Sequence, residues 1–143
     1  MNRLVVGLEE VGNADVAVVG GKNASLGEMI NNLSTTGVNV PGGFATTAEA
    51  YREFLAENKL DKKIGQRLQN LDVNDVTALA EAGNEIRRWI IDAPLGQRLQ
   101  DEISSANQKM EALQGSNDAV AVRYTATAED IPEATYAGTQ ETY

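Results

Sequence analysis

Residues 16–33 read VAVVGGKNASLGEMINNL, and this stretch carries the strongest signal for the fold. Its first four residues, Val16 to Val19, are all apolar, and we interpret them as a strand. Two glycines and Lys22 then interrupt the apolar run and predict a turn. A helix is expected beyond the turn, because apolar side chains recur there at i, i+3, i+4 and i+7, at Leu26, Met29, Ile30 and Leu33.

The flanking sequence predicts further strands and helices. Leu4 to Leu8 is expected to form a strand, and Val38 to Pro41 an extended segment, because the residue before a proline avoids the helical region. Alternation from Ala119 to Tyr124 predicts another strand. Helical patterns lie between these strands, with apolar stripes that start at Ala50, Leu60, Val76 and Leu95.

Capping signals mark the ends of two of these helices. Thr46-Thr47-Ala48-Glu49 fits a capping box in which the Thr46 side chain accepts a backbone N–H three residues on. Either Asp72 or Asn74 is expected to cap the helix near Val76, and Asp92-Ala93-Pro94 to end it.

These segments predict a single α+β domain over residues 1–143, mostly helical in the middle, with short strands at both ends. Residues 125–143 are interpreted as a loop that leads into one more strand. Binding residues are often held on loops beside strands, so functional residues are expected at the two ends of the chain.

The composition excludes several classes of chemistry. The chain has 143 residues and neither cysteine nor histidine, which rules out disulfides, thiolate nucleophiles, Cys/His zinc sites and Ser-His-Asp triads. Its formal charge of -9 argues against a nucleic-acid-binding module. No apolar run is long enough to cross a membrane, and residues 1–10 lack the apolar core of a signal peptide, so a cytoplasmic location is expected.

Three segments are candidate binding sites, and each also has a purely structural interpretation. Gly20-Gly21-Lys22 precedes a helix, where glycines allow close approach and lysine attracts phosphate, but an ordinary surface turn fits as well. Arg123 at a strand end suits either a phosphate or a nearby carboxylate. Gly138 lies among hydroxyl and amide side chains, as in a ligand loop or a polar turn.

Four stretches, in order and at these separations, strongly resemble the phosphoenolpyruvate synthase (pyruvate, water dikinase) family. They are VGGKNASLGEMINNL at 19–33, GVNVPGGFATTAEAYREFL at 37–55, IRRWIID at 86–92 and VAVRYTATAEDIPEATYAGTQETY at 120–143. Pyruvate phosphate dikinase and rifampin phosphotransferase share the nucleotide-binding region, but the stretches at 43–55 and 86–92 look closest to the synthase.

The resemblance implies that this chain is the N-terminal portion of an ATP-grasp-type domain in a larger enzyme. It implies that Lys22 and Arg123 contact the phosphates of ATP, and that Gly138 and Thr142 belong to the same nucleotide site. The ligands of Mg²⁺, the phosphohistidine domain and the pyruvate domain are expected outside this chain, which is expected to hold no catalytic or metal-binding residue. The implied reaction converts ATP, pyruvate and water to AMP, phosphoenolpyruvate and phosphate, and the isolated chain is expected to be inactive.

One departure from the family pattern keeps alternatives open. The family usually has two serines after the arginine, where this chain has Tyr124 and Thr125. The tyrosine ring would either crowd the phosphate site or point outward. The alternatives are a standalone, non-catalytic helical module for binding or regulation that has lost the nucleotide, and part of a related rifampin phosphotransferase.

Overall fold

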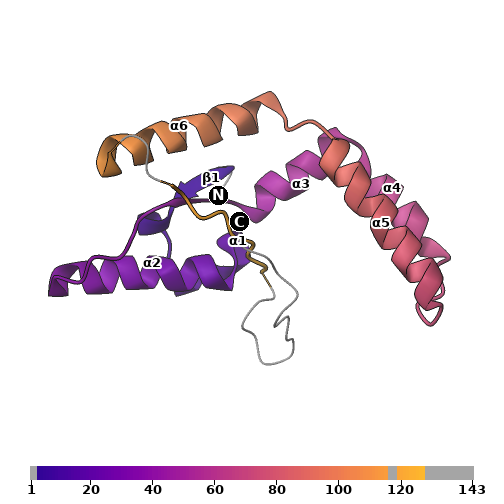
Figure 1. The fold of residues 1–143 in the computed structure, drawn as a ribbon, viewed down its shortest axis with the longest axis horizontal. Helices are drawn as coiled ribbons and strands as arrows, with labels where there is room; N and C mark the ends of the chain where they lie inside the picture. The colour runs from indigo at the N-terminus through magenta and orange to yellow at the C-terminus, as the bar shows by residue number, and fades with distance from the viewer. Residues whose placement is uncertain (1–2, 116–118, 128–143) are drawn as a thin grey trace. The chain divides into compact units, whose positions relative to one another are not determined.

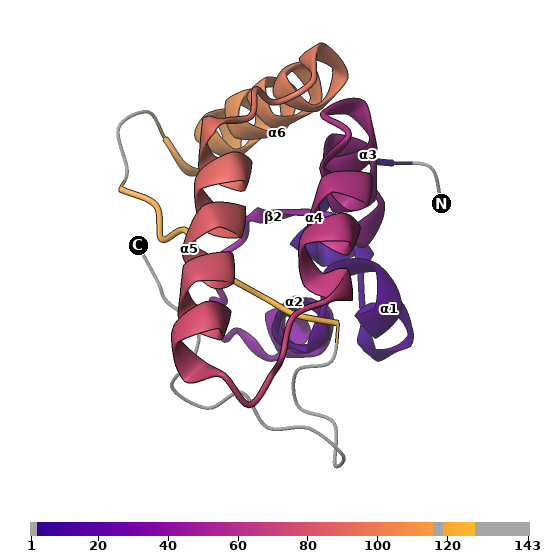
Figure 2. The same ribbon diagram turned by 90° about the vertical axis from the view of Figure 1, so that its right-hand side faces the viewer.

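The computed structural model describes residues 3–115 and 119–127, and they form an α+β arrangement that is mostly helical (Figures 1 and 2), as the sequence predicts. The chain divides into two compact units, one of Met1–Ala50 with Arg98–Tyr143 and the other of Tyr51–Gln97. The elements are β1 (Val5–Gly7), η1 (Leu8–Glu10), η2 (Asn13–Asp15), α1 (Val16–Val19), α2 (Gly21–Leu33), η3 (Ser34–Thr36), β2 (Phe44–Thr46), α3 (Ala48–Glu57), α4 (Leu60–Gln69), α5 (Val76–Asp92) and α6 (Gln97–Gln114), where η denotes a single turn of 3-10 helix.

The first unit is organised around a two-stranded antiparallel sheet. In its register Val5 lies opposite Thr46, Val6 opposite Ala45 and Gly7 opposite Phe44. Successive side chains of a strand point to opposite faces, so neighbouring residues of this sheet enter different clusters. Figure 1 shows α2 on one side of the sheet and α6 on the other.

One face of the sheet packs against the α1–α2 region. Val6 and Ala45 join a buried apolar cluster that also contains Leu8, Val11, Val19 and Ala24. Gly27 of α2 fits closely against the chain around η1, because a Cβ at this position would collide with the carbonyl oxygens of Leu8 and Val11. The glycine therefore permits helix α2 to approach the backbone beside β1.

The other face of the sheet packs against α6. Leu4 and Val5 lie in a second buried cluster with Ala50 and Leu99, and Phe44, Ile103 and Ala106 pack at its border. The α6 members, Leu99, Ile103 and Ala106, follow the helical spacing i, i+4 and i+7. The predicted stripe of this helix is confirmed at Leu99 and Ile103, whereas Leu113 is 86% exposed.

The second unit contains most of α3 together with α4 and α5. Helices α4 and α5 lie side by side (Figures 1 and 2). Arg67 Nε donates to Glu85 Oε2 at 2.7 Å, and Lys63 Nζ lies 4.1 Å from the centroid of the Trp89 ring. Leu60 and Ala82 are buried on the two helices, whereas Val76, at the start of the predicted stripe of α5, is exposed.

Two of the predicted strands are wrong. Val16–Val19 forms the short helix α1, closed by a hydrogen bond from Gly20 N to Val16 O at 2.8 Å, because a run of four apolar residues does not distinguish a strand from a buried helical turn. Residues 119–127 contain only an isolated bridge at Arg123 rather than a strand over Ala119 to Tyr124. The later part of the predicted C-terminal loop and strand lies outside the described residues.

Both predicted helix caps are displaced in the structure. Thr46 belongs to β2 and Thr47 caps α3 instead, accepting from Ala50 N at 3.1 Å. Asp75 caps α5 by accepting from Ala78 N at 3.1 Å, while Asp72 accepts from Asn74 N in the preceding turn. The predicted end of α5 at Asp92 is confirmed.

Candidate functional site

The Gly20-Gly21-Lys22 turn joins α1 to α2. Gly20 has φ 84° and ψ 160°, a backbone conformation that is essentially restricted to glycine. Gly20 and Gly21 are both buried, and Asn23 Nδ2 donates to Val19 O at 3.0 Å, which satisfies a carbonyl at the end of α1. The turn is therefore a fixed junction between two helices rather than an open surface loop.

The C-terminal end of the segment 119–127 reaches this junction. The amide of Gly21 donates to Ala126 O at 3.3 Å. A Cβ built on Gly20 would collide with the Thr125 hydroxyl and would lie 3.0 Å from Ala126 O. In Figure 1 the segment that ends at residue 127 reaches the junction of α1 and α2. Two candidate segments that are far apart in the sequence thus meet in the structure.

Lys22 and Arg123, the two predicted phosphate-binding cations, lie on these two segments. Lys22 is in the first turn of α2 and is half-buried, whereas Arg123 is exposed and lies two residues before Thr125. Lysine provides a compact charge and arginine a planar fork, and both side chains bind phosphate groups in proteins. Tyr124, beside Arg123, is 57% exposed, so its ring is not buried in the junction.

The other two predicted nucleotide-site residues, Gly138 and Thr142, lie outside the described residues. Within residues 3–115 and 119–127 there is no group of three or more His, Cys, Asp or Glu side chains that could hold a metal ion.

Sequence reasoning missed the residues that join the two segments. Thr125 and Ala126 contact the turn, one through its side chain and the other through its carbonyl group. A backbone acceptor has no sequence signature. The paired glycines were the available signal, since two adjacent glycines often mark a place where another part of the chain comes close.

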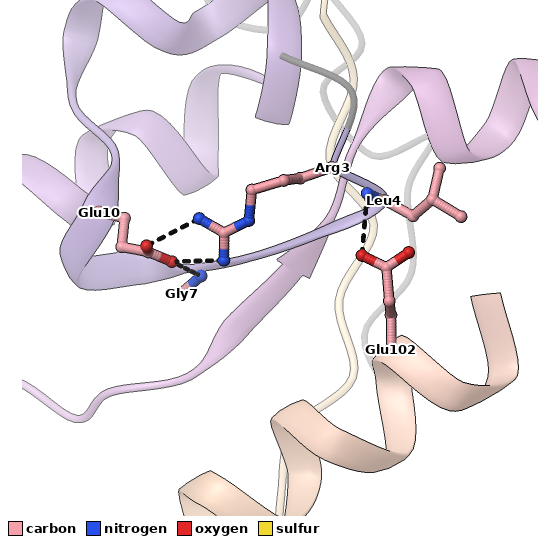
Figure 3. Close-up of polar contacts among 5 residues, drawn as sticks. All are labelled: Arg3, Leu4, Gly7, Glu10 and Glu102. Carbon is pink, nitrogen blue, oxygen red and sulfur yellow. Dashed lines mark hydrogen bonds and ion pairs between the residues drawn. The ribbon is translucent and has the colours of Figure 1, made fainter. Parts of the chain in front are cut away.

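A charged cluster lies at the start of β1 (Figure 3). Arg3 Nη1 donates to Glu10 Oε1 at 2.8 Å, and Gly7 N donates to Glu10 Oε2 at 2.8 Å. The Arg3 hydrogen bond and the Gly7 amide hold the pKa of Glu10 below its ordinary value, and Glu10 raises the pKa of Arg3. Leu4 N donates to Glu102 Oε1 at 3.3 Å, which links β1 to α6. The cluster thus stabilises the corner between β1, η1 and α6.

In the part of the chain that is described, no helix has the length and apolar character needed to span a membrane.

The chain is similar to known proteins over nearly all of its length. A family model described as "Pyruvate phosphate dikinase, AMP/ATP-binding domain" matches residues 16–143. The chain is 56% identical over 140 residues to the phosphoenolpyruvate synthase of Neisseria meningitidis serogroup B, a match that covers 97% of this chain. It is 54% identical over 145 residues to the same enzyme of Pseudomonas aeruginosa and 50% identical over 140 residues to that of Escherichia coli K12, with 100% and 98% of the chain covered. The chain spans 18% of the length of each of these relatives.

Proposed function

This chain belongs to the family of the pyruvate phosphate dikinase AMP/ATP-binding domain, and from that premise we propose that it forms part of the ATP site of a phosphoenolpyruvate synthase. The overall reaction would convert ATP, pyruvate and water to AMP, phosphoenolpyruvate and phosphate. The phosphohistidine and pyruvate domains that complete this reaction would be supplied by the remainder of a longer enzyme. Because ATP and pyruvate are metabolites of the cytoplasm, the same proposal assigns the chain to that compartment.

The observation that carries this proposal is the contact between the Gly20-Gly21 turn and residues 125–126. It brings the segment of Lys22 to the segment of Arg123. A triphosphate carries several negative charges, and a pair of cations on adjoining segments suits it better than either one alone. Gly138 and Thr142 are proposed to belong to the same nucleotide site.

The chemical role of this chain would be to position ATP and to offset its charge. Enzymes that transfer phosphoryl groups act mainly by orientation and electrostatic stabilisation. Lys22 and Arg123 would hold the phosphates while the transferred group moves to an acceptor on another domain. Mg²⁺, when bound with ATP, would further neutralise the phosphates, and its protein ligands are proposed to lie outside this chain.

Isothermal titration of the chain with Mg-ATP tests the proposal. We expect Lys22→Ala and Arg123→Ala each to weaken binding about 10- to 100-fold, as for the loss of a hydrogen bond to a charged group. Lys62→Ala and Arg88→Ala, which remove exposed cations from α4 and α5, serve as matched controls and should leave the affinity unchanged. Circular dichroism verifies that each variant is folded.

Two results would contradict the proposal. One is the absence of Mg-ATP binding by the folded wild-type chain, which would favour a binding or regulatory module without nucleotide. The other is an equal loss in all four variants, since this would indicate a nonspecific charge effect. In the full-length protein that carries this chain, ATP-dependent consumption of pyruvate supports a synthase, whereas consumption of rifampin identifies a rifampin phosphotransferase. The isolated chain should form no phosphoenolpyruvate.

A further inference from the structure

We propose that Gly20 is a positioning residue whose missing side chain leaves the space in which Thr125 packs, and that this contact holds the Arg123 segment against the Lys22 turn. The expected effect of this contact on nucleotide binding rests on the proposed function. The packing itself does not depend on it. Neither Gly20 nor Thr125 is proposed to touch the nucleotide.

The first observation is steric. A Cβ on Gly20 would collide with Thr125 Oγ1 and lie 3.0 Å from both Thr125 Cγ2 and Ala126 O. Real Cβ atoms essentially never approach other heavy atoms more closely than 3.0 Å, so a side chain at position 20 would force the Thr125 side chain to move and would press on Ala126 O. One of the affected atoms is a backbone oxygen, which cannot move aside by a change of rotamer.

The second observation comes from the other glycines with positive φ. Gly37 has φ 83° and Gly115 has φ 93°, yet a Cβ on either would meet no atom within 4 Å. Their turns require glycine for backbone reasons alone. Among the described glycines with positive φ, Gly20 is thus the one where a special backbone conformation and a close contact with a distant segment coincide.

The third observation is the distribution of burial along residues 119–127. Val120, Val122 and Tyr124 are each more than half exposed, whereas Thr125 and Ala126 are half-buried. The burial of this segment is therefore concentrated at the two residues that contact Gly20 and Gly21. Displacing them would shift Arg123, because it lies only two residues before Thr125.

A distance measurement tests the contact without nucleotide. The chain contains no cysteine, so spin labels can be attached uniquely at Ser25→Cys on α2 and Val120→Cys, both exposed positions. We expect a narrow distribution of distances between the two spin labels in the otherwise unchanged chain. In Gly20→Ala this distribution should be broad or shifted. Gly37→Ala should retain the narrow distribution.

A second pair of variants avoids the backbone of Gly20, whose ψ of 160° differs from the 5° of Gly37. Thr125→Phe enlarges the side chain that faces Gly20, and Thr127→Phe makes the same change at an exposed neighbour. Thr125→Phe should broaden the distribution and Thr127→Phe should not. This pair remains informative even if Gly20→Ala fails to fold.

Titration with Mg-ATP then connects the contact to binding. Gly20→Ala and Thr125→Phe are expected to weaken binding at least 10-fold, and Gly37→Ala and Thr127→Phe to leave it within 2-fold, by analogy with the loss of an oriented charged contact. An unchanged distance distribution in folded Thr125→Phe or Gly20→Ala would overturn the inference. Failure of the wild-type chain to bind Mg-ATP would instead overturn the proposed function, and the distance measurement would still decide the contact.

Discussion

In the unit of Met1–Ala50 and Arg98–Tyr143 two buried apolar clusters enclose a small sheet, whereas in the unit of Tyr51–Gln97 many large apolar side chains remain exposed. The second unit buries Phe54, Leu60 and Ala82 among the described residues, while Val73, Val76 and Ile91 are each more than two-thirds exposed. It also relies on contacts at its surface, such as the Arg67–Glu85 ion pair. Both units have amphipathic helices, but only the first supplies a sheet against which their apolar faces can pack.

The largest expected effect concerns the core of the first unit. Leu4 is 1% exposed, and Leu4→Ala should lower the free energy of unfolding by about 2–5 kcal/mol through lost burial and a residual cavity. Leu113→Ala is the matched control, because Leu113 is almost fully exposed, and it should change stability by less than about 0.5 kcal/mol. Urea denaturation followed by circular dichroism measures both. Similar losses in the two variants would contradict the assignment of the core.

A Gly→Ala substitution should lower the free energy of unfolding in the first unit and raise it in the second. Gly27→Ala on α2 should destabilise by about 1–3 kcal/mol, because its Cβ collides with the backbone oxygens of Val11 and Leu8. Gly65→Ala on α4 meets no atom within 4 Å and should stabilise by about 0.5–1 kcal/mol through helix propensity. Thermal unfolding of both variants makes the comparison. A gain for Gly27→Ala would show that α2 does not pack closely on the chain near η1.

A smaller difference in lost unfolding free energy is expected between substitutions of the two helix caps, Thr47 and Asp75. Thr47 is buried, accepts from Ala50 N at 3.1 Å and donates to Arg3 O at 2.9 Å, so Thr47→Ala should cost about 1–2 kcal/mol. Asp75→Ala removes an exposed cap on α5 and should cost about 0.5–1 kcal/mol. Thr47→Ser, which retains the hydroxyl, should recover most of the loss in denaturant unfolding. If Thr47→Ser is as unstable as Thr47→Ala, the hydroxyl is not the stabilising group.

The smallest expected effect is the pH dependence of the Arg3–Glu10 pair. The pKa of Glu10 is lowered in the folded state. Its contribution to the free energy of unfolding is therefore fully present above the unfolded-state pKa of about 4.5 and is lost as the pH falls through the folded-state pKa. Both side chains are partly exposed, so the contribution should be only about 0.5 kcal/mol. The difference in unfolding free energy between wild type and Glu10→Gln should therefore shrink below pH 4.5. An NMR titration should show the pKa of Glu10 rising in Arg3→Gln, and no rise would contradict the pairing.

The sequence predicted the features that depend on local periodicity. The stripe of α6 and the end of α5 at Asp92 follow from apolar spacing and a proline, and both agree with the structure. The caps were displaced because several adjacent residues had suitable side chains, and only the strand pairing of Thr46 decided that Thr47 is the cap. The strand predicted at Val16–Val19 is a short helix, because four apolar residues fit a helical turn as well as a strand.

The candidate site was only partly accessible from sequence. The sequence marks Lys22 and Arg123 as phosphate-binding candidates, and the resemblance to a known family favours that role. The contact that unites their segments could not be predicted, because it depends on the backbone angles of Gly20 and on the carbonyl of Ala126. Neither property is encoded in a short motif.

The division of the first unit into two stretches of chain has a consequence for folding on the ribosome. Leu4, Val5 and Ala50 emerge early, but their cluster includes Leu99 of α6 and cannot close until that helix has been synthesised. The unit of Tyr51–Gln97 is continuous in sequence, so it can fold from contacts between neighbouring helices before the cluster of Leu4, Val5 and Ala50 is complete. During that interval Leu4 and Val5 lack the α6 side chains that bury them in the folded unit, whereas Val6 can already pack against Ala24 and Ala45.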